Sequence, residues 1–168
     1  DTNESESNLW IADTAAGEPK QITHTGKDRA ARWSPDGQRL AFLSRREGRS
    51  QVYVLTLGAG EARAVTRFTS DVETVRWTPD GRTLIFSAVV DPECADDGCR
   101  KASIDRRGKG VRVYEHWPVR LAMSWTDGMR SHVFAVRADG SAAPRDLTPG
   151  REFDVPARQS IDGSVDGN

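Results

Sequence analysis

A motif that returns after 44 residues constrains the fold of this chain more than any other feature. Trp33-Ser-Pro-Asp-Gly37 is repeated as Trp77-Thr-Pro-Asp-Gly81. Proline, aspartate and glycine in this order favour a tight turn, because proline presets φ and glycine accepts a positive φ. After each turn, large apolar side chains occupy alternate positions, which predicts a strand.

Two further series follow the same repeat. One consists of apolar triplets, at Leu9–Ile11, Val52–Val54 and Val133–Ala135. The other consists of segments that end in threonine, at Pro19–Thr23, Ala62–Thr66 and Pro144–Thr148. The third copy of each series comes only after an insertion. Repeats of about 40–45 residues that contain four short strands are typical of β-propeller blades.

Strands are predicted at residues 38–44, 51–57 and 82–88. Both faces of residues 51–57 are largely apolar, as in a sheet that lies between two neighbouring sheets. No long amphipathic helix is predicted. The fold class is therefore all-β, a partial β-propeller of about three to four blades of antiparallel strands. A closed propeller needs roughly four to eight blades, so the chain is predicted to be an incomplete arc of a larger propeller.

The repeat also sets the expected domain organisation. Residues 1–156 form the partial propeller, with an insertion at about 89–131 that does not follow the blade pattern. Residues 157–168 are polar and rich in glycine and aspartate, which predicts a loop or a disordered tail.

Cys94 and Cys99 lie within the insertion. Three interpretations are open: two free thiols in a surface loop, a disulfide in a periplasmic or secreted protein, or half of a metal site. The spacing favours free thiols slightly over a disulfide. A metal site is the weakest of the three, because no second cysteine pair is present and the next histidine, His116, is distant.

The insertion also concentrates basic and aromatic residues. Residues 100–112 contain six basic side chains and one acid. They form either an anion patch or a solvated loop, and the neighbouring acidic cluster at 93–97 favours the solvated loop. Trp117 and Trp125, near Arg120, either line a ligand pocket or pack the insertion onto the blades, and packing is favoured. Trp33 and Trp77 recur with the repeat and are interpreted as structural.

The composition excludes several classes of partner. With 24 basic and 25 acidic residues, the chain has a net charge of −1, which gives no attraction to nucleic acid. No segment approaches the ~18 apolar residues of a membrane span. The N-terminal residues lack the features of a signal peptide, as a mature protein also would. The compartment is periplasm or cytoplasm, with a slight preference for the periplasm.

No known catalytic motif occurs in the sequence. There is no G-x-S-x-G, H-E-x-x-H, Walker loop or G-x-G-x-x-G. The three histidines, His24, His116 and His132, are predicted to be turn or surface residues. We therefore expect no catalytic residue, no metal and no cofactor in this chain.

The repeats resemble the blades of TolB-type propellers and of the propellers of prolyl oligopeptidase-family serine peptidases. Residues 114–156, with Tyr114-Glu-His-Trp-Pro-Val-Arg120 and Asp127-Gly-Met-Arg-Ser-His132-Val-Phe134, are similar to the dipeptidyl-peptidase and acylaminoacyl-peptidase branch. The resemblance implies a two-domain enzyme, in which a propeller covers an α/β-hydrolase domain that supplies the Ser-Asp-His triad. No triad residue can be assigned here, and the hydrolase domain is absent from these residues.

The expected function follows from this resemblance. The chain is interpreted as the non-catalytic propeller of a serine exopeptidase, which gates access of short peptides to a hydrolase domain. Glu115 and Arg120 are the candidate substrate-binding residues: a carboxylate suits an α-amino group, and an arginine suits a peptide carbonyl or carboxylate. The alternative is a free-standing TolB-like module that binds another protein. Open sheet edges predict self-association.

Overall fold

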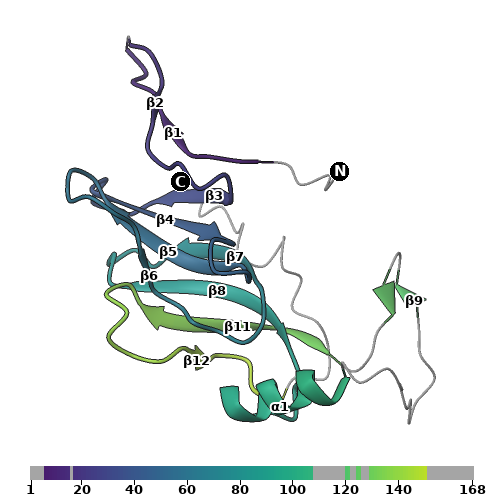
Figure 1. The fold of residues 1–168 in the computed structure, drawn as a ribbon. Coiled ribbons are helices and arrows are strands. Elements are labelled where there is room, and N and C mark those ends of the chain that lie inside the picture. Colours follow the sequence, from purple (N-terminus) through teal and green to yellow (C-terminus); the bar gives the residue numbers. More distant parts are fainter. Residues whose placement is uncertain (1–5, 16, 108–119, 122–123, 126–128, 151–168) are drawn as a thin grey trace.

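The computed structural model describes residues 6–15, 17–107, 120–121, 124–125 and 129–150 of the chain. Two four-stranded antiparallel sheets dominate it, and Figure 1 shows them one below the other. The first, blade 1, comprises β3 (Asp28–Trp33), β4 (Arg39–Ser44), β5 (Gln51–Thr56) and β6 (Arg63–Ala64). The second, blade 2, comprises β7 (Val72–Trp77), β8 (Thr83–Val90), β11 (Arg130–Arg137) and β12 (Arg145–Asp146). The partial all-β propeller is confirmed.

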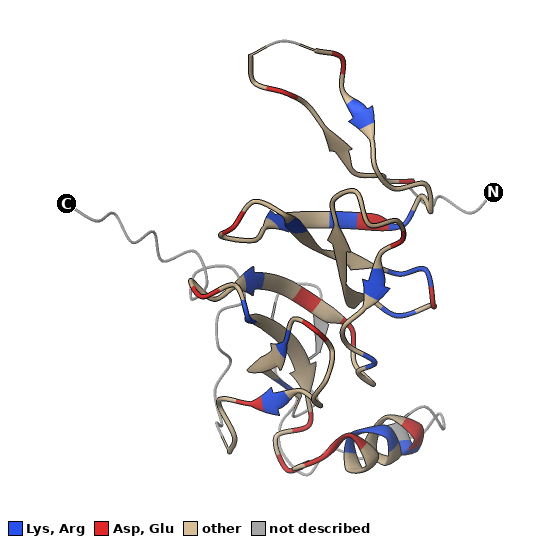
Figure 2. Cartoon of the chain, turned by 90° about the vertical axis from the view of Figure 1, so that its left-hand side faces the viewer, with Lys and Arg blue, Asp and Glu red and all other residues tan. Residues whose placement is uncertain are grey.

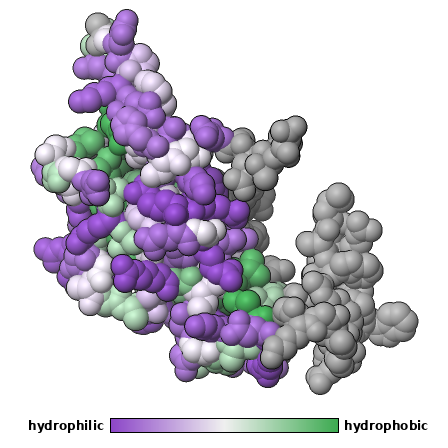
Figure 3. Space-filling view, viewed as in Figure 1, coloured by the Kyte–Doolittle hydropathy of each residue, from purple (hydrophilic) through white to green (hydrophobic). Residues whose placement is uncertain are grey.

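A short hairpin precedes blade 1. Its strands are β1 (Trp10–Ile11) and β2 (Lys20–Gln21). Leu9, Ile11 and Ile22 pack against the apolar face of blade 1 that contains Leu40 and Phe42. By the repeat, β1 and β2 match the third and fourth strands of a blade. Figure 3 shows a hydrophobic strip where this hairpin meets blade 1, on a face that is otherwise mostly hydrophilic.

The insertion interrupts blade 2 between its second and third strands. The β8–β11 pairing runs from Thr83 opposite Arg137 to Val90 opposite Arg130, so the triplet at 133–135 lies in the third strand of blade 2. Within the insertion lie α1 (Asp97–Arg107), β9 (Arg120–Leu121) and β10 (Ser124–Trp125). The eleven-residue helix α1 was not predicted from the sequence.

The main hydrophobic core lies between the two blades. Ala41, Leu43 and Val52 of blade 1 pack with side chains of blade 2, among them Phe86 and Phe134. All five of these residues are fully buried. This explains why the strands have apolar residues on both faces: one face of blade 1 meets the hairpin and the other meets blade 2.

Trp77, at the end of β7, connects blade 2 to blade 1. Its indole nitrogen donates a hydrogen bond to the carbonyl of Arg32, at 3.0 Å. The guanidinium carbon of Arg39 lies 4.8 Å from the centre of the Trp77 ring. Trp33, the equivalent residue of blade 1, is 50% exposed. The two tryptophans therefore have the same place in the repeat but different surroundings.

The turns at the ends of the first two strands are built alike in both blades. The hydroxyl of Ser34 and the amide of Gln38 donate hydrogen bonds to the Asp36 carboxylate, and these bonds lower its pKa to about 2. Thr78 and Arg82 lower the pKa of Asp80 in the same way. Gly37 and Gly81 have φ of 68° and 64°, which glycine adopts readily. These aspartates therefore stabilise turns.

Among the described residues, no helix has the length and apolar character that a membrane span requires.

Candidate functional site

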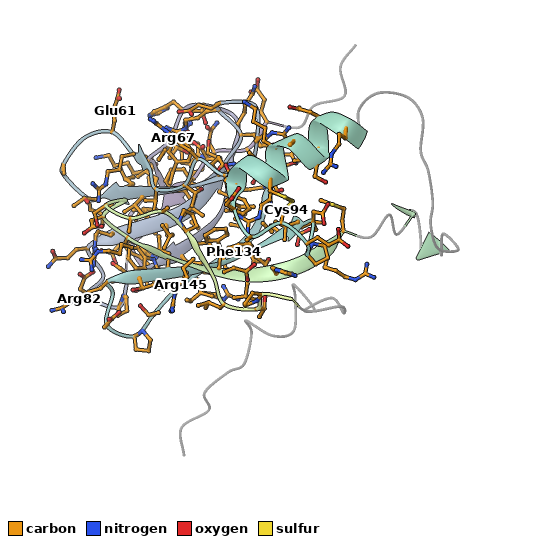
Figure 4. The ribbon with its side chains drawn as sticks, turned by 90° about the horizontal axis from the view of Figure 1, so that it is seen from below. Glu61, Arg67, Arg82, Cys94, Phe134 and Arg145 are labelled. Atoms are coloured by element: carbon orange, nitrogen blue, oxygen red, sulfur yellow. A yellow bond between two sulfur atoms is a disulfide. The ribbon has the colours of Figure 1, made fainter. Side chains whose placement is uncertain are left out.

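The connections at one end of the blades form the candidate site. They are the β4–β5 turn (45–50), the β6–β7 connection (65–71) and the first part of the insertion (91–107). Antiparallel pairing brings these three segments to the same end of the sheets, and Figure 4 shows α1 and Arg67 there. We call this region the insertion end. Loops that a rigid sheet holds in place often carry binding residues.

A disulfide and a cap fix the start of α1. Cys94 and Cys99 are disulfide-bonded in the structure, and Cys94 is buried. The amide of Cys99 donates a hydrogen bond of 2.8 Å to the Asp96 carboxylate, which caps the first turn of the helix. The loop before α1 is thereby tied to its first turn. Formation of this bond in solution stays a prediction.

Arg100 holds α1 against blade 2. Its guanidinium carbon lies 5.2 Å from the ring centre of Phe68 and 5.3 Å from that of Phe134, so the cation faces two aromatic rings. Its Nη2 lies 3.9 Å from Oδ2 of Asp146. The expectation of a solvated basic loop is wrong for Arg100, which is buried because the helix folds back onto the blade.

His132 lies beside this arginine in β11. It is 1% exposed, and its Nδ1 lies 2.8 Å from Oδ2 of Asp146. The prediction of a turn or surface position is therefore wrong for His132, whereas His24 is exposed as expected. His116 lies outside the described residues. Asp146 thus contacts both an arginine and a histidine in the interior.

Blade 1 contains a similar arrangement, and this indicates an architectural role. The guanidinium carbon of Arg46 lies 4.4 Å from the ring centre of Tyr53, the repeat equivalent of Phe134. Its Nη2 donates to Oδ1 of the buried Asp28, at 3.0 Å. Burial raises the pKa of Asp28, but hydrogen bonds from groups that include Ser44 and Arg46 outweigh it, so the pKa lies below its usual value. Each blade therefore places an arginine over aromatic rings and beside a carboxylate.

The residues proposed from sequence for substrate binding are not brought together by the described part of the structure. Glu115 lies outside it. The backbone of Arg120 pairs with Trp125 between β9 and β10, and its side chain is outside the description. Trp117 is outside as well. No cluster of His, Cys, Asp or Glu suited to a metal ion occurs among the described residues.

Sequence reasoning singled out the basic run that contains Lys101 but missed two arginines of blade 1 near α1. Arg49 lies in the β4–β5 turn and Arg67 in the β6–β7 connection, while Lys101 lies on α1 itself. Figure 2 shows basic residues, in blue, on the loops of blade 1 and on α1. Arg49 and Arg67 lie outside the insertion in sequence, whereas Lys101 belongs to the basic run at residues 100–112. The repeat could have revealed the two arginines, because it predicts that both connections leave their sheets at the end where the insertion begins.

Comparisons with known proteins agree with the fold. A family model described as "TolB beta propeller domain" matches residues 1–97. The uncharacterized peptidase YuxL of Bacillus subtilis is 40% identical over 95 residues, which are 54% of this chain and 14% of that protein. Dipeptidyl-peptidase 5 of Porphyromonas endodontalis is 24% identical over 168 aligned residues, which cover 96% of this chain and 23% of the relative. The chain therefore spans less than a quarter of either relative.

A solved structure shows the same fold. It is an acylaminoacyl peptidase in complex with Z-Gly-Gly-Phe-chloromethyl ketone, with a TM-score of 0.62 and 19% sequence identity. The superposition covers 86% of this chain and 21% of the peptidase. At this identity the likeness concerns the fold alone.

Proposed function

This chain belongs to the family of TolB β-propeller domains, and from that membership we propose that it is the propeller part of a serine exopeptidase of the dipeptidyl- or acylaminoacyl-peptidase type. In this proposal residues 1–156 are the propeller part and residues 157–168 are a loop or disordered tail, as the sequence predicts. The propeller gates short peptides on their way to an α/β-hydrolase domain. That second domain supplies the nucleophile, the histidine base and the oxyanion donors.

The observation that carries this proposal is the extent of the peptidase alignment. The TolB family model matches residues 1–97, whereas the dipeptidyl-peptidase aligns with 96% of the chain and so extends through the insertion and β11. Blade 1 joins its second and third strands with a tight turn, and blade 2 joins them with the insertion. The feature that distinguishes blade 2 thus lies within the part aligned to a peptidase.

The structure supports gating through the position of α1. Arg100, the Cys94–Cys99 disulfide and the Thr69–Asp97 hydrogen bond hold the helix at the end of the blades. A fixed element beside the entrance to a catalytic domain limits the size of the substrate that passes. The insertion therefore acts as a steric filter, without taking part in bond cleavage.

The test uses the longer polypeptide that contains the hydrolase domain. Residues 91–129 are replaced by a turn copied from 45–50, and hydrolysis of a dipeptidyl-nitroanilide is compared with that of a twelve-residue peptide of the same N-terminal sequence. We expect kcat/KM for the long peptide to rise about tenfold, with the nitroanilide little changed; tenfold corresponds to removing a barrier of about 1.4 kcal/mol. Equal changes for both substrates contradict gating.

The chain by itself provides a second test. Purified residues 1–168 are expected to hydrolyse neither dipeptidyl- nor aminoacyl-nitroanilides. Turnover that a serine-directed inhibitor abolishes would overturn the division of labour proposed here.

A free-standing protein-binding propeller is the second candidate, and the TolB family model at residues 1–97 favours it. It predicts recovery of one stoichiometric protein partner from an envelope extract, without any associated peptidase activity.

A further inference from the structure

A hollow of about 350 Å³ lies at the insertion end, between blade 1 and α1. Arg49 and Arg67 line it from the side of the blade, and Lys101 lines it from the helix. Phe68 and Ile104 add apolar surface. These lining residues are not part of the turn motif, and they are distinct from the architectural arginines Arg46 and Arg100.

The three basic side chains are exposed, and none of them is ion-paired within the described part of the chain. Their neighbours differ: Arg45 pairs with Asp71, and Arg46 with Asp28. Three cations that line one hollow outnumber the two carboxylates there and attract an anion. Their arrangement therefore favours an anionic ligand.

Two acidic residues also line the hollow, and they limit its net charge to about one positive unit. Asp97 is engaged, because its Oδ1 accepts hydrogen bonds from the hydroxyl of Thr69, at 2.6 Å, and from the Thr69 amide, at 3.3 Å. Asp105 lies on α1 two turns further along the helix. A ligand with one anionic group suits this balance better than a polyanion such as a nucleic acid.

The walls of the hollow are held in place before any ligand binds. On α1, Arg100 packs on Phe68, and the hydroxyl of Ser103 donates to the Asp91 carboxylate at 2.6 Å. The adjacent face of the helix carries Lys101 and Ile104 toward the hollow. A preformed site loses less conformational entropy when a ligand binds, which favours binding.

We infer that this hollow binds the carboxylate of a short peptide, with Arg49, Arg67 and Lys101 as the cationic partners. Guanidinium groups form paired hydrogen bonds with carboxylates, and an ammonium adds a point charge. An apolar side chain next to the carboxylate rests on Ile104, which is half-buried, because Phe68 is buried in the core. The volume is at the lower end of small-ligand pockets and suits a ligand of about two residues. The choice of a peptide rests on the function proposed above.

The test measures binding to residues 1–168 by amide chemical shifts and calorimetry. The probes are N-acetyl-Gly-Phe as the free acid, the same dipeptide as its C-terminal amide, N-acetyl-Glu-Phe-amide, and acetate. We expect the free acid to shift the amides of Thr69 and Lys101. N-acetyl-Glu-Phe-amide has a side-chain carboxylate and no terminal one. Comparing its affinity with that of the free acid therefore distinguishes the two kinds of carboxylate. Equal binding of the uncharged amide, or of acetate, overturns the inference, as does the absence of binding at 10 mM peptide, a weak limit of about −3 kcal/mol.

Substitutions locate the site. Arg67→Gln and Lys101→Gln are each expected to weaken binding of the free acid about tenfold, the usual effect of losing one charge-assisted hydrogen bond. Arg82→Gln, an exposed arginine at the opposite end of the blades (Figure 4), is the matched control and is expected to leave binding unchanged. An equal loss in all three variants contradicts the site. Because this assay uses no hydrolase domain, a failure of peptide binding can be distinguished from a failure of the peptidase proposal.

Discussion

Arg100 is the residue on which the position of α1 depends. Its replacement by alanine removes the cation from the faces of Phe68 and Phe134 and from its place beside Oδ2 of Asp146, which still contacts His132. We expect a loss of about 2–3 kcal/mol in the free energy of unfolding, because a buried cation and its packing are lost together. Urea denaturation followed by circular dichroism measures this. Arg106→Ala, at an exposed position on the same helix, is the control and is expected to cost about 0.5 kcal/mol or less.

The lowered pKa of Asp28 predicts how the free energy of unfolding depends on pH. Its pKa is lowered in the folded state, so its ionised form stabilises the fold above the unfolded value of 3.8, and this contribution is lost as the pH falls through the folded value. Asp28→Asn is expected to destabilise the chain at neutral pH and to lose part of the acid dependence. The difference in unfolding free energy between the two proteins should narrow below pH 3.8. If this difference in unfolding free energy stays constant from pH 7 to 2.5, ionisation of Asp28 does not contribute to stability. Asp13→Asn, at an exposed position, is the control.

At the scale of single elements, the strands were predictable and the helix was not. Residues 38–44 and 82–88 were predicted as strands, and β4 and β8 begin one residue later. Both strands were predictable because each follows a Pro-Asp-Gly turn and has apolar residues at alternate positions. The buried face of α1 instead contains Arg100 and Ser103, so no apolar periodicity marks it. The candidate site escaped prediction for the same reason, since it exists only once this polar helix is held beside the loops of blade 1.

The loop before α1 gives a prediction for this element. Under oxidising conditions we expect Cys94 and Cys99 to resist alkylation unless a reductant is added, and the intact mass to be lower by two hydrogens. The double replacement by serine is expected to destabilise α1 with little effect on the blades, because the closed loop is short and its entropic contribution is about 2 kcal/mol. Hydrogen exchange of α1 amides measures this. Equal acceleration of exchange in β4 and β8 would contradict a local role.

At the scale of the whole molecule, Trp33 predicts association between copies. Trp77 contacts a backbone carbonyl and an arginine of blade 1, whereas Trp33 is half exposed, and blade 2 leaves its far face without a further blade among the described residues. A second copy can therefore present that far face to Trp33. We expect sedimentation to show dimers or larger species at high concentration, and Trp33→Ala to reduce them.

Trp10→Ala is the matched control, because Trp10 is 59% exposed but lies on the hairpin and not at the repeat position that Trp33 and Trp77 share. A strictly monomeric parent chain, or equal effects of both substitutions, would count against this mode of association.

The placement of the insertion has a consequence for engineering and for divergence. Val90 and Arg130 are direct partners across two strands, so the ends of residues 91–129 leave and rejoin the sheet about 5 Å apart. Segments of very different length can close a gap of that size at little cost to the framework. Blade 2 thus offers a natural grafting point, where recognition sequences can be exchanged while the scaffold beneath them keeps its register.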